Sequence, residues 1–150
     1  MKYVTKSPKQ TQQLAGFLLN KFLKTTRKYA LVFALEGELG AGKTTFVQGL
    51  ARALHIKAKI KSPTFNLMKK HKILDSRFSI LASDFYHLDC YRLRDHRDLL
   101  LLGIKDILDN PKNIVLIEWS DRVKKILPKR HIKIHIDHIN TNTRNIRIEM

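Results

Sequence analysis

The sequence is short of cysteine, of long apolar runs and of acidic residues. Cys90 is the single cysteine among 150 residues, so the chain cannot form an internal disulfide or a metal centre of several thiolates. No apolar run reaches the roughly 18–20 residues that a membrane-spanning helix needs. The N-terminal segment holds no apolar stretch of the signal-peptide type. We therefore expect a protein of the reducing cytoplasm.

The scarcity of acidic residues leaves a strongly basic chain. Asp and Glu number 13 and Lys and Arg number 29, which gives a formal net charge of +16. The basic residues are dense in a first basic segment (Lys57, Lys59, Lys61, Lys69, Lys70 and Lys72) and a second basic segment (Arg122, Lys124, Lys125, Lys129, Arg130 and Lys133). Such a charge attracts polyanions, RNA among them, but a lysine-rich surface can also serve solvation alone.

The pattern along the chain predicts one α/β domain over residues 1–150. Ser7 as N-cap and Pro8 at the first helical position begin an amphipathic helix that ends at about Leu23. Further helices are predicted over 43–54, in two short segments of 95–108 broken at Gly103, and over 121–127. Strands are predicted over 30–35, 65–68, 78–88 and 114–117, and the alternating segments 131–137 and 145–149 predict antiparallel strands.

The sharpest motif runs from Gly37 to Thr44, where G-E-L-G-A-G-K-T matches G-x-x-x-x-G-K-[ST] in full. Its glycines allow successive backbone N–H groups to face one anion, and the helix that follows adds the positive end of its dipole. Lys43 can then reach the β- and γ-phosphates of a nucleotide, and the Thr44 hydroxyl can bind Mg²⁺. An ordinary glycine turn is the alternative, but a buried strand before the motif and an amphipathic helix after it favour a P-loop.

Three other segments carry polar residues that fit such a site. Glu118 follows the apolar run 114–117 directly, where a P-loop protein needs an acid near the metal; Trp119 after it can pack in the core or form a platform beside the nucleotide. The segment 62–65, Ser-Pro-Thr-Phe, is either a switch that senses the γ-phosphate or an ordinary turn. His87, Asp89 and Tyr91 share one face if the strand extends that far. A histidine, a carboxylate and the nearby Arg92 could polarise water, hold Mg²⁺ through water or stabilise phosphoryl charge. A satisfied polar edge and a His/Asp/Cys metal site are the alternatives.

The ordered set of these motifs resembles the TsaE family, the small bacterial P-loop ATPases of tRNA threonylcarbamoyladenosine biosynthesis. The resemblance rests on G-E-L-G-A-G-K-T-T at 37–45, Ser-Pro-Thr-Phe at 62–65, H-x-D-x-Y-R at 87–92, Leu-Gly-Ile at 102–104 and Glu-Trp at 118–119. It implies a three-layer P-loop NTPase fold with a central, largely parallel sheet and antiparallel C-terminal strands. It also implies ATP and Mg²⁺ as cofactors and the proteins TsaD and TsaB of the threonylcarbamoyltransferase complex as partners.

The resemblance also assigns roles to individual residues. Lys43 is the phosphate-binding, catalytic lysine, Asp89 organises catalysis, and Thr44 with Glu118 forms the metal site. The remaining nucleotide-binding positions are Gly37, Leu39, Gly40, Ala41, Gly42, Thr45, Thr11, Thr64 and Trp119. Relatives usually carry more acidic residues before the Leu-Gly-Ile segment, where this chain has only Asp98.

Two other classes of protein fit parts of the pattern. A small-molecule kinase shares the P-loop and the size, but it needs an acceptor pocket and usually an arginine-bearing lid, and no clear lid segment occurs here. An RNA-binding module with ATP as a structural ligand would use the net charge of +16. The basic surface makes direct contact with tRNA a further expectation for the TsaE interpretation as well.

Overall fold

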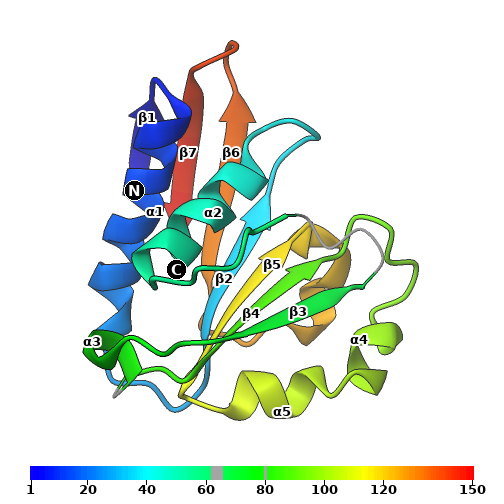
Figure 1. Ribbon diagram of the computed structural model, residues 1–150. Coiled ribbons are helices and arrows are strands. Elements are labelled where there is room, and N and C mark those ends of the chain that lie inside the picture. The colour runs from blue at the N-terminus through cyan, green and yellow to red at the C-terminus, as the bar shows by residue number, and fades with distance from the viewer. Residues whose placement is uncertain (62–65, 80) are drawn as a thin grey trace.

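The computed structural model describes residues 1–61, 66–79 and 81–150, and its centre is one mixed sheet of seven strands in the order β1-β7-β6-β2-β5-β4-β3 (Figure 1). The strands are β1 (Lys2–Thr5), β2 (Leu31–Glu36), β3 (Met68–Lys72), β4 (Asp84–Asp89), β5 (Asn113–Glu118), β6 (Ile132–His138) and β7 (Arg144–Glu149). The helices are α1 (Pro8–Leu23), α2 (Lys43–Ala53), α3 (Ser76–Ser79), α4 (Arg97–Leu101), α5 (Ile104–Asp109) and the 3₁₀ segment η1 (Ser120–Ile126).

The centre of the sheet is parallel and both edges are antiparallel. Strand β5 pairs in parallel with β2 and β4, and β2 pairs in parallel with β6. Strand β3 is antiparallel to β4 at one edge, while β7 and then β1 are antiparallel at the other. This topology confirms the predicted largely parallel sheet with antiparallel C-terminal strands.

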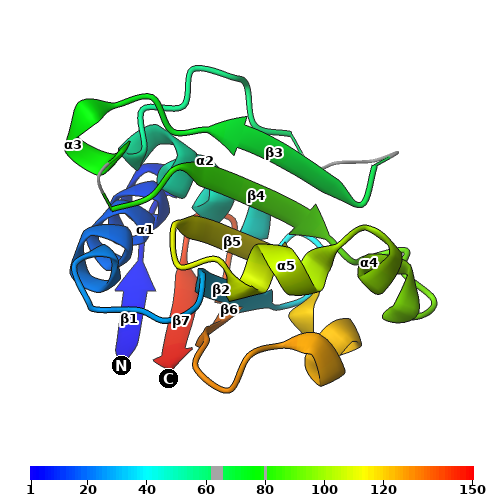
Figure 2. The same cartoon turned by 90° about the horizontal axis from the view of Figure 1, so that it is seen from below.

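Helices cover both faces of the sheet, which makes three layers. Figure 2 shows α1 and α2 on one side of the sheet and α4 and α5 on the other. Strand β5 divides its side chains accordingly: Ile114 and Leu116 pack in the core under α1 and α2, and Val115 and Ile117 pack in the core under α4, α5 and η1. A parallel strand covered on both faces is apolar at every position, as the run 114–117 predicts.

Helix α1 begins where the sequence predicts and packs closely on α2. The Ser7 hydroxyl accepts a hydrogen bond from the Gln10 N–H at 3.2 Å, and Pro8 takes the first helical position. At the crossing of the two helices, a Cβ added to Gly49 would lie 2.6 Å from the Gln12 backbone and 2.9 Å from the Ala15 Cβ. Gly49 is therefore required by the packing that holds α2 against the rest of the domain.

Several predicted boundaries are wrong at the sheet edges. The strand β1 was not predicted, because four residues of mixed polarity gain a partner only when β7 lies beside them. The strand predicted over 65–68 is β3, Met68–Lys72, a largely polar edge strand. The helix predicted over 121–127 is a 3₁₀ segment with a kink at Val123, whose side chain is buried.

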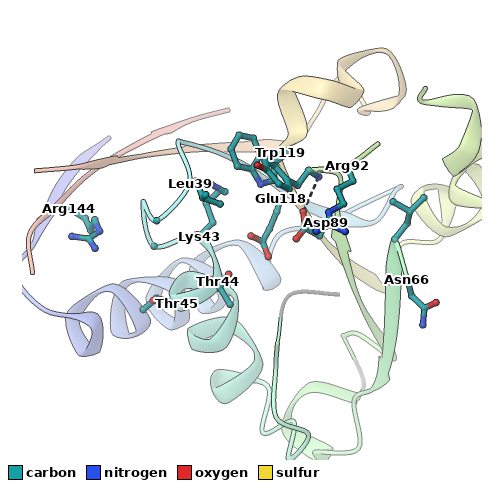
Figure 3. A pocket seen from close by; sticks show the side chains of 14 residues that line it. Leu39, Lys43, Thr44, Thr45, Asn66, Asp89, Arg92, Glu118, Trp119 and Arg144 are labelled. Carbon is teal, nitrogen blue, oxygen red and sulfur yellow. Dashed lines mark hydrogen bonds between the residues drawn. The ribbon is translucent and has the colours of Figure 1, made fainter. Parts of the chain in front are cut away.

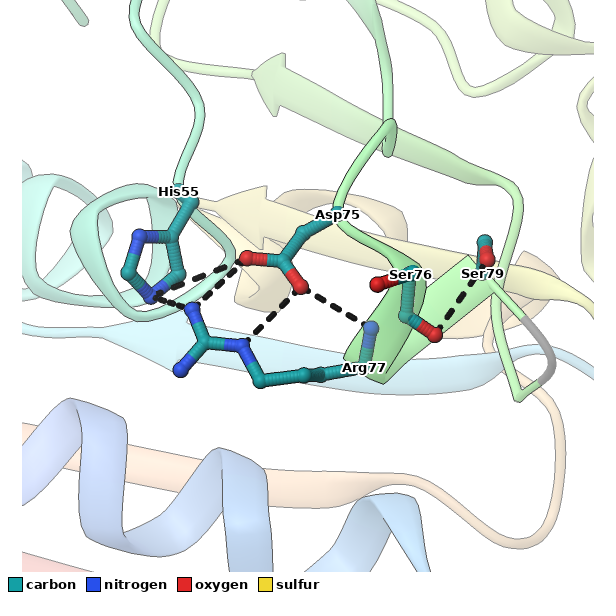
Figure 4. A network of polar contacts seen from close by, with 5 residues as sticks. All are labelled: His55, Asp75, Ser76, Arg77 and Ser79. Atoms are coloured by element: carbon teal, nitrogen blue, oxygen red, sulfur yellow. Dashed lines mark hydrogen bonds and ion pairs between the residues drawn. The ribbon is translucent and has the colours of Figure 1, made fainter.

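The strand predicted over 78–88 is interrupted by the short helix α3 and begins only at Asp84. The Asp75 carboxylate organises this turn by accepting hydrogen bonds from the Arg77 N–H at 2.9 Å and its Nε at 3.0 Å (Figure 4). These bonds with Arg77 lower the pKa of Asp75 to about 2. Arg77 Nη2 also lies 2.6 Å from the His55 ring nitrogen at the end of α2. A local carboxylate thus turns the chain where apolar periodicity alone indicates a strand.

None of the helices in the described ranges has the length and apolarity required to span a bilayer.

Candidate nucleotide-binding site

The glycine-rich loop connects buried strand β2 to helix α2, as the motif predicts. Gly37 has φ 143°, and a Cβ there would overlap the Ile136 carbonyl oxygen of neighbouring strand β6. Gly42 has φ 104° and is the N-cap of α2, which begins at Lys43. Both positions need a residue without a side chain, and the resulting turn directs the loop toward the amino end of α2.

A cavity of about 600 Å³ opens between this loop and the carboxyl ends of β4 and β5 (Figure 3). The predicted site residues that line it are Leu39, Gly40, Gly42, Lys43, Thr44, Thr45, Asp89, Glu118 and Trp119. Tyr91 and Arg92, from the candidate segment 87–92, also line the cavity, and so do Asn66, Leu67 and Arg144, which were not predicted. Segments that lie far apart in the sequence therefore meet in one hollow.

Three of the predicted site residues that the structure describes do not line the cavity. Gly37 lies against the Ile136 carbonyl of β6, and Ala41 is buried in the core under α1 and α2. Thr11 is also buried, and its hydroxyl shares a 2.8 Å hydrogen bond with the hydroxyl of Thr5. Thr64, with the rest of the segment 62–65, lies outside the described residues.

Lys43 is turned back onto its own loop. Its Nζ donates hydrogen bonds to the carbonyl oxygens of Gly37 at 2.6 Å and Glu38 at 2.7 Å. The same ammonium lies 4.0 Å from the centre of the Trp119 ring, which is a cation–π contact. Burial lowers the pKa of Lys43, and three carboxylates oppose that shift: Glu118, Asp89 and Asp121. The lysine is thus held among oxygen acceptors at the place where a phosphate chain would enter.

Two acidic side chains come from neighbouring strand ends. In the parallel pairing of β4 with β5, Asp89 stands opposite Glu118, so both carboxylates lie at the same edge of the sheet. Glu118 is only 2% exposed, and its Oε1 accepts a 2.7 Å hydrogen bond from Nε2 of the buried His87. Asp89 Oδ1 accepts from the Tyr91 N–H at 3.0 Å. Figure 3 shows Asp89 and Glu118 beside each other, facing the loop that carries Lys43.

Trp119 closes the cavity with an unusual backbone conformation. Its φ of 57° lies in the left-handed region, which is costly for a bulky residue and concentrates at functional sites. Its ring lies 4.9 Å from that of Tyr91, and the Arg122 guanidinium lies 5.6 Å from the Tyr91 ring and 5.7 Å from the Trp119 ring. The turn continues into Ser120, whose hydroxyl donates to the Leu35 carbonyl at 3.3 Å. Trp119 therefore serves both as packing and as a wall of the cavity.

Arg144 is a cavity residue that sequence reasoning missed. It begins β7, and its Nε donates to the Ala41 carbonyl of the glycine-rich loop at 2.7 Å, while Nη1 donates to the Asn140 carbonyl at 2.7 Å. No local pattern marks such a residue, because the contact joins positions far apart in the chain. Asn66 and Leu67 directly precede edge strand β3 in the chain, and no local pattern marks them as cavity residues either.

The residues present fit a nucleotide with Mg²⁺. A cradle of positive-φ glycines at the start of a helix is a favourable surface for phosphate. No group of three or more His, Cys, Asp or Glu that could hold a metal occurs among the described residues. Mg²⁺ needs no such cage, because it binds through one or two protein oxygens together with substrate phosphates and water. Thr44 and Glu118 would supply those two oxygens.

The fold and the loop define a P-loop protein, in which a buried strand leads through the glycine-rich loop into a helix and an adjacent parallel strand ends in an acid. Within that class, the chain belongs to the TsaE family. The family model described as "Threonylcarbamoyl adenosine biosynthesis protein TsaE" matches residues 5–146. This match confirms the resemblance that the ordered motifs indicate.

Individual relatives agree with the family model. Proteins named tRNA threonylcarbamoyladenosine biosynthesis protein TsaE are similar to this chain in Haemophilus influenzae, at 36% identity over 84% of this chain and 74% of the relative, and in Bacillus subtilis, at 32% identity over 97% and 83%. The crystal structure of Bacillus subtilis YdiB superposes with a TM-score of 0.70 and 29% identity, covering 97% of this chain and 82% of that one. These likenesses extend over nearly the whole fold described above.

Proposed function

We propose that this protein is a Mg²⁺-dependent ATPase that serves tRNA threonylcarbamoyladenosine biosynthesis. The observation that carries the proposal is the cavity in which Lys43 and Thr44 of the P-loop face Glu118 and Asp89 of two adjacent strand ends. The place in tRNA modification rests on the names of the relatives, which cover most of this chain.

The proposed chemistry uses the two sides of the cavity: the glycine-rich loop with the start of α2 on one side, and the carboxyl ends of β4 and β5 on the other. The N–H groups of the loop and the amino end of α2 bind the phosphates, and Lys43 exchanges its bonds to the Gly37 and Glu38 carbonyls for bonds to phosphate oxygens. Thr44 and Glu118 would hold Mg²⁺, which would supply positive charge to offset that of the phosphate oxygens. Asp89 orients the attacking water from the opposite wall. Trp119 and Tyr91 exclude bulk water from one side.

The proposed partners are the TsaD and TsaB proteins of the threonylcarbamoyltransferase complex. In this proposal, ATP binding and hydrolysis reset the complex and the protein does not itself modify the base. The experiment is a phosphate-release assay of the purified protein with ATP and Mg²⁺, alone, with TsaD and TsaB, and with tRNA added. Stimulation that needs the complex supports the proposal. Transfer of phosphate to a small-molecule acceptor would identify a kinase instead.

A direct contact with tRNA is the second part of the proposal, and one basic surface favours it. The second basic segment contributes Arg122, Lys124 and Lys125 to a cavity of about 320 Å³, and Arg94 adds a fourth cation. No ion pair between described residues joins any of these four to a carboxylate, although Asp95 and Asp121 also line the cavity. In the first basic segment, by contrast, Lys70 and Lys72 are 3.7 and 3.1 Å from Asp84.

The dependence of tRNA affinity on salt tests this contact. Each phosphate contact adds about 0.7–0.9 to the slope of log affinity against log salt. We expect the triple variant Arg94→Gln, Lys124→Gln, Lys125→Gln to lower the slope by about two to three units. The matched control is Lys57→Gln, Lys59→Gln, Lys61→Gln, which removes the same charge from the first basic segment. Equal slopes in wild type and both variants would show that these basic residues do not contact tRNA and only solvate the surface.

A further inference from the structure

His87 is a buried histidine directly beneath the cavity. It lies on β4 with no exposed surface. It pairs with Leu116, and both Leu116 and Phe85, two positions earlier on β4, pack in the core under α1 and α2. Its Nε2 donates to Glu118 Oε1 at 2.7 Å, because an ionised carboxylate can only accept. Its Nδ1 has no hydrogen-bond partner in the part of the chain that the structure describes. A buried polar ring that leaves one nitrogen unsatisfied needs a compensating reason to be there.

The bond from His87 determines how the Glu118 carboxylate is presented. The parallel register sets His87 beside Leu116 and Asp89 beside Glu118, so both partners come from rigid, fully hydrogen-bonded strands. With Oε1 engaged by the histidine from within the core, Oε2 is the oxygen left for the cavity. The Lys43 ammonium approaches from the loop side and Asp89 from the adjacent strand end. The carboxylate is thereby fixed in one orientation rather than free to rotate.

We propose that His87 is a positioning residue for the metal carboxylate: its Nε2–H holds Glu118 so that one oxygen points at Mg²⁺ and the phosphates. This rests on the proposed function, because it concerns the metal of that same site. Outer residues of this kind orient metal ligands and raise their basicity, and their loss typically weakens metal affinity by about 10–100-fold. His87 itself does not line the cavity, so it acts through Glu118 alone.

Binding of a fluorescent ATP analogue across a Mg²⁺ titration separates positioning from mere packing. His87→Leu keeps an apolar body in the core but removes the donor. We expect it to raise the Mg²⁺ concentration needed for half-maximal binding by about 10–100-fold, with the affinity for metal-free nucleotide unchanged. His87→Gln keeps a side-chain N–H at a similar reach, and we expect it to recover most of the wild-type Mg²⁺ dependence.

His71 offers a matched control from the neighbouring strand. His71 lies on β3 opposite Phe85 of β4, and the two rings stack. Among the described residues it makes no hydrogen bond or ion pair with a carboxylate. His71→Leu removes a histidine from the same sheet and should leave the Mg²⁺ dependence as in wild type. If it shifted the dependence as much as His87→Leu does, general disturbance of the sheet would explain both, and the proposal would fail.

The outcomes distinguish this proposal from the proposed function. If nucleotide binding by the wild type does not depend on Mg²⁺, the proposed metal site itself is wrong. A wild type that responds to Mg²⁺, with His87→Leu responding equally, would overturn the role of His87 alone. If His87→Leu fails to fold, His87→Gln and the nitrogen-15 spectrum of the histidines decide. An Nε2 that keeps its proton and whose resonance shifts when Mg²⁺-nucleotide binds supports the coupling. A ring that does not respond, or an Nε2 that loses its proton, contradicts it.

Discussion

The two walls of the cavity are built in different ways. The loop wall between β2 and α2 presents backbone groups and the side chains of Lys43 and Thr44, all within one short stretch of sequence. Its shape depends on glycines such as Gly37 and Gly42. The strand-end wall consists of side chains, Asp89 and Glu118, that come from separate strands and meet through the β4–β5 register. The loop wall depends on one local motif, whereas the strand-end wall exists only in the assembled sheet.

The largest expected effect belongs to the residue that links the two walls. Lys43→Ala removes the ammonium that contacts the loop carbonyls and the Trp119 ring. We expect ATP hydrolysis to fall by at least about 10²–10³-fold, the scale of losing one preorganised charge-stabilising donor. Nucleotide affinity should drop as well, with the thermal midpoint near that of wild type. Lys57→Ala is the control for a lost surface charge, and turnover retained in Lys43→Ala would refute the P-loop assignment.

A change in the strand-end wall should slow ATP hydrolysis and leave ATP binding unchanged. Asp89→Asn is nearly isosteric, so we expect folding and ATP affinity to be kept. Hydrolysis should be slower by about 10²-fold if the carboxylate orients water, the lower end of general acid–base contributions. Single-turnover phosphate release and nucleotide titration measure the two quantities separately. Wild-type hydrolysis in this variant would make Asp89 a structural residue.

The metal should couple the two walls. Thr44 lies on the loop wall and Glu118 on the strand-end wall, yet both are expected to act on one ion. Thr44→Ala and Glu118→Gln should each weaken Mg²⁺-dependent nucleotide binding by about 10-fold or more and metal-free binding much less. The double variant should lose less than the sum of the two free energies, since groups that serve one ion are coupled. Fully additive losses would mean that Glu118 has another role.

The smallest effect on the site should come from the packing behind the loop wall. Gly49→Ala forces a Cβ against the Gln12 backbone. It should lower the free energy of unfolding by about 1–3 kcal/mol, the usual cost of overpacking. Gly16→Ala is the matched control in the same α1–α2 interface, where the added Cβ would be 3.3 Å from the Ala53 Cβ. Urea denaturation should separate the two variants, and equal stability would show that α1 and α2 can move apart.

The sequence by itself determined the local parts of this protein. Ser7 with Pro8 specifies the start of α1, and the spacing from Gly37 to Thr44 specifies the phosphate loop, because hydrogen bonds and backbone angles within a few residues decide both. The apolar run 114–117 likewise identifies a strand buried on both faces. Together with the phosphate loop, that run also predicts Glu118 as the metal-site acid, whereas the catalytic role predicted for Asp89 came from the family resemblance.

Tertiary structure alone decided the rest. The His87–Glu118 bond and the reach of Arg144 to the Ala41 carbonyl join residues from different strands and loops, so no sequence period carries them. The edge strands β1 and β3 are strands because β7 and β4 provide hydrogen-bonding partners. Trp119 takes its left-handed backbone conformation between β5 and η1, where packing against Lys43 and Tyr91 compensates a local cost. Long-range contacts outweigh local preference at these positions, because only the folded sheet brings the partners within reach.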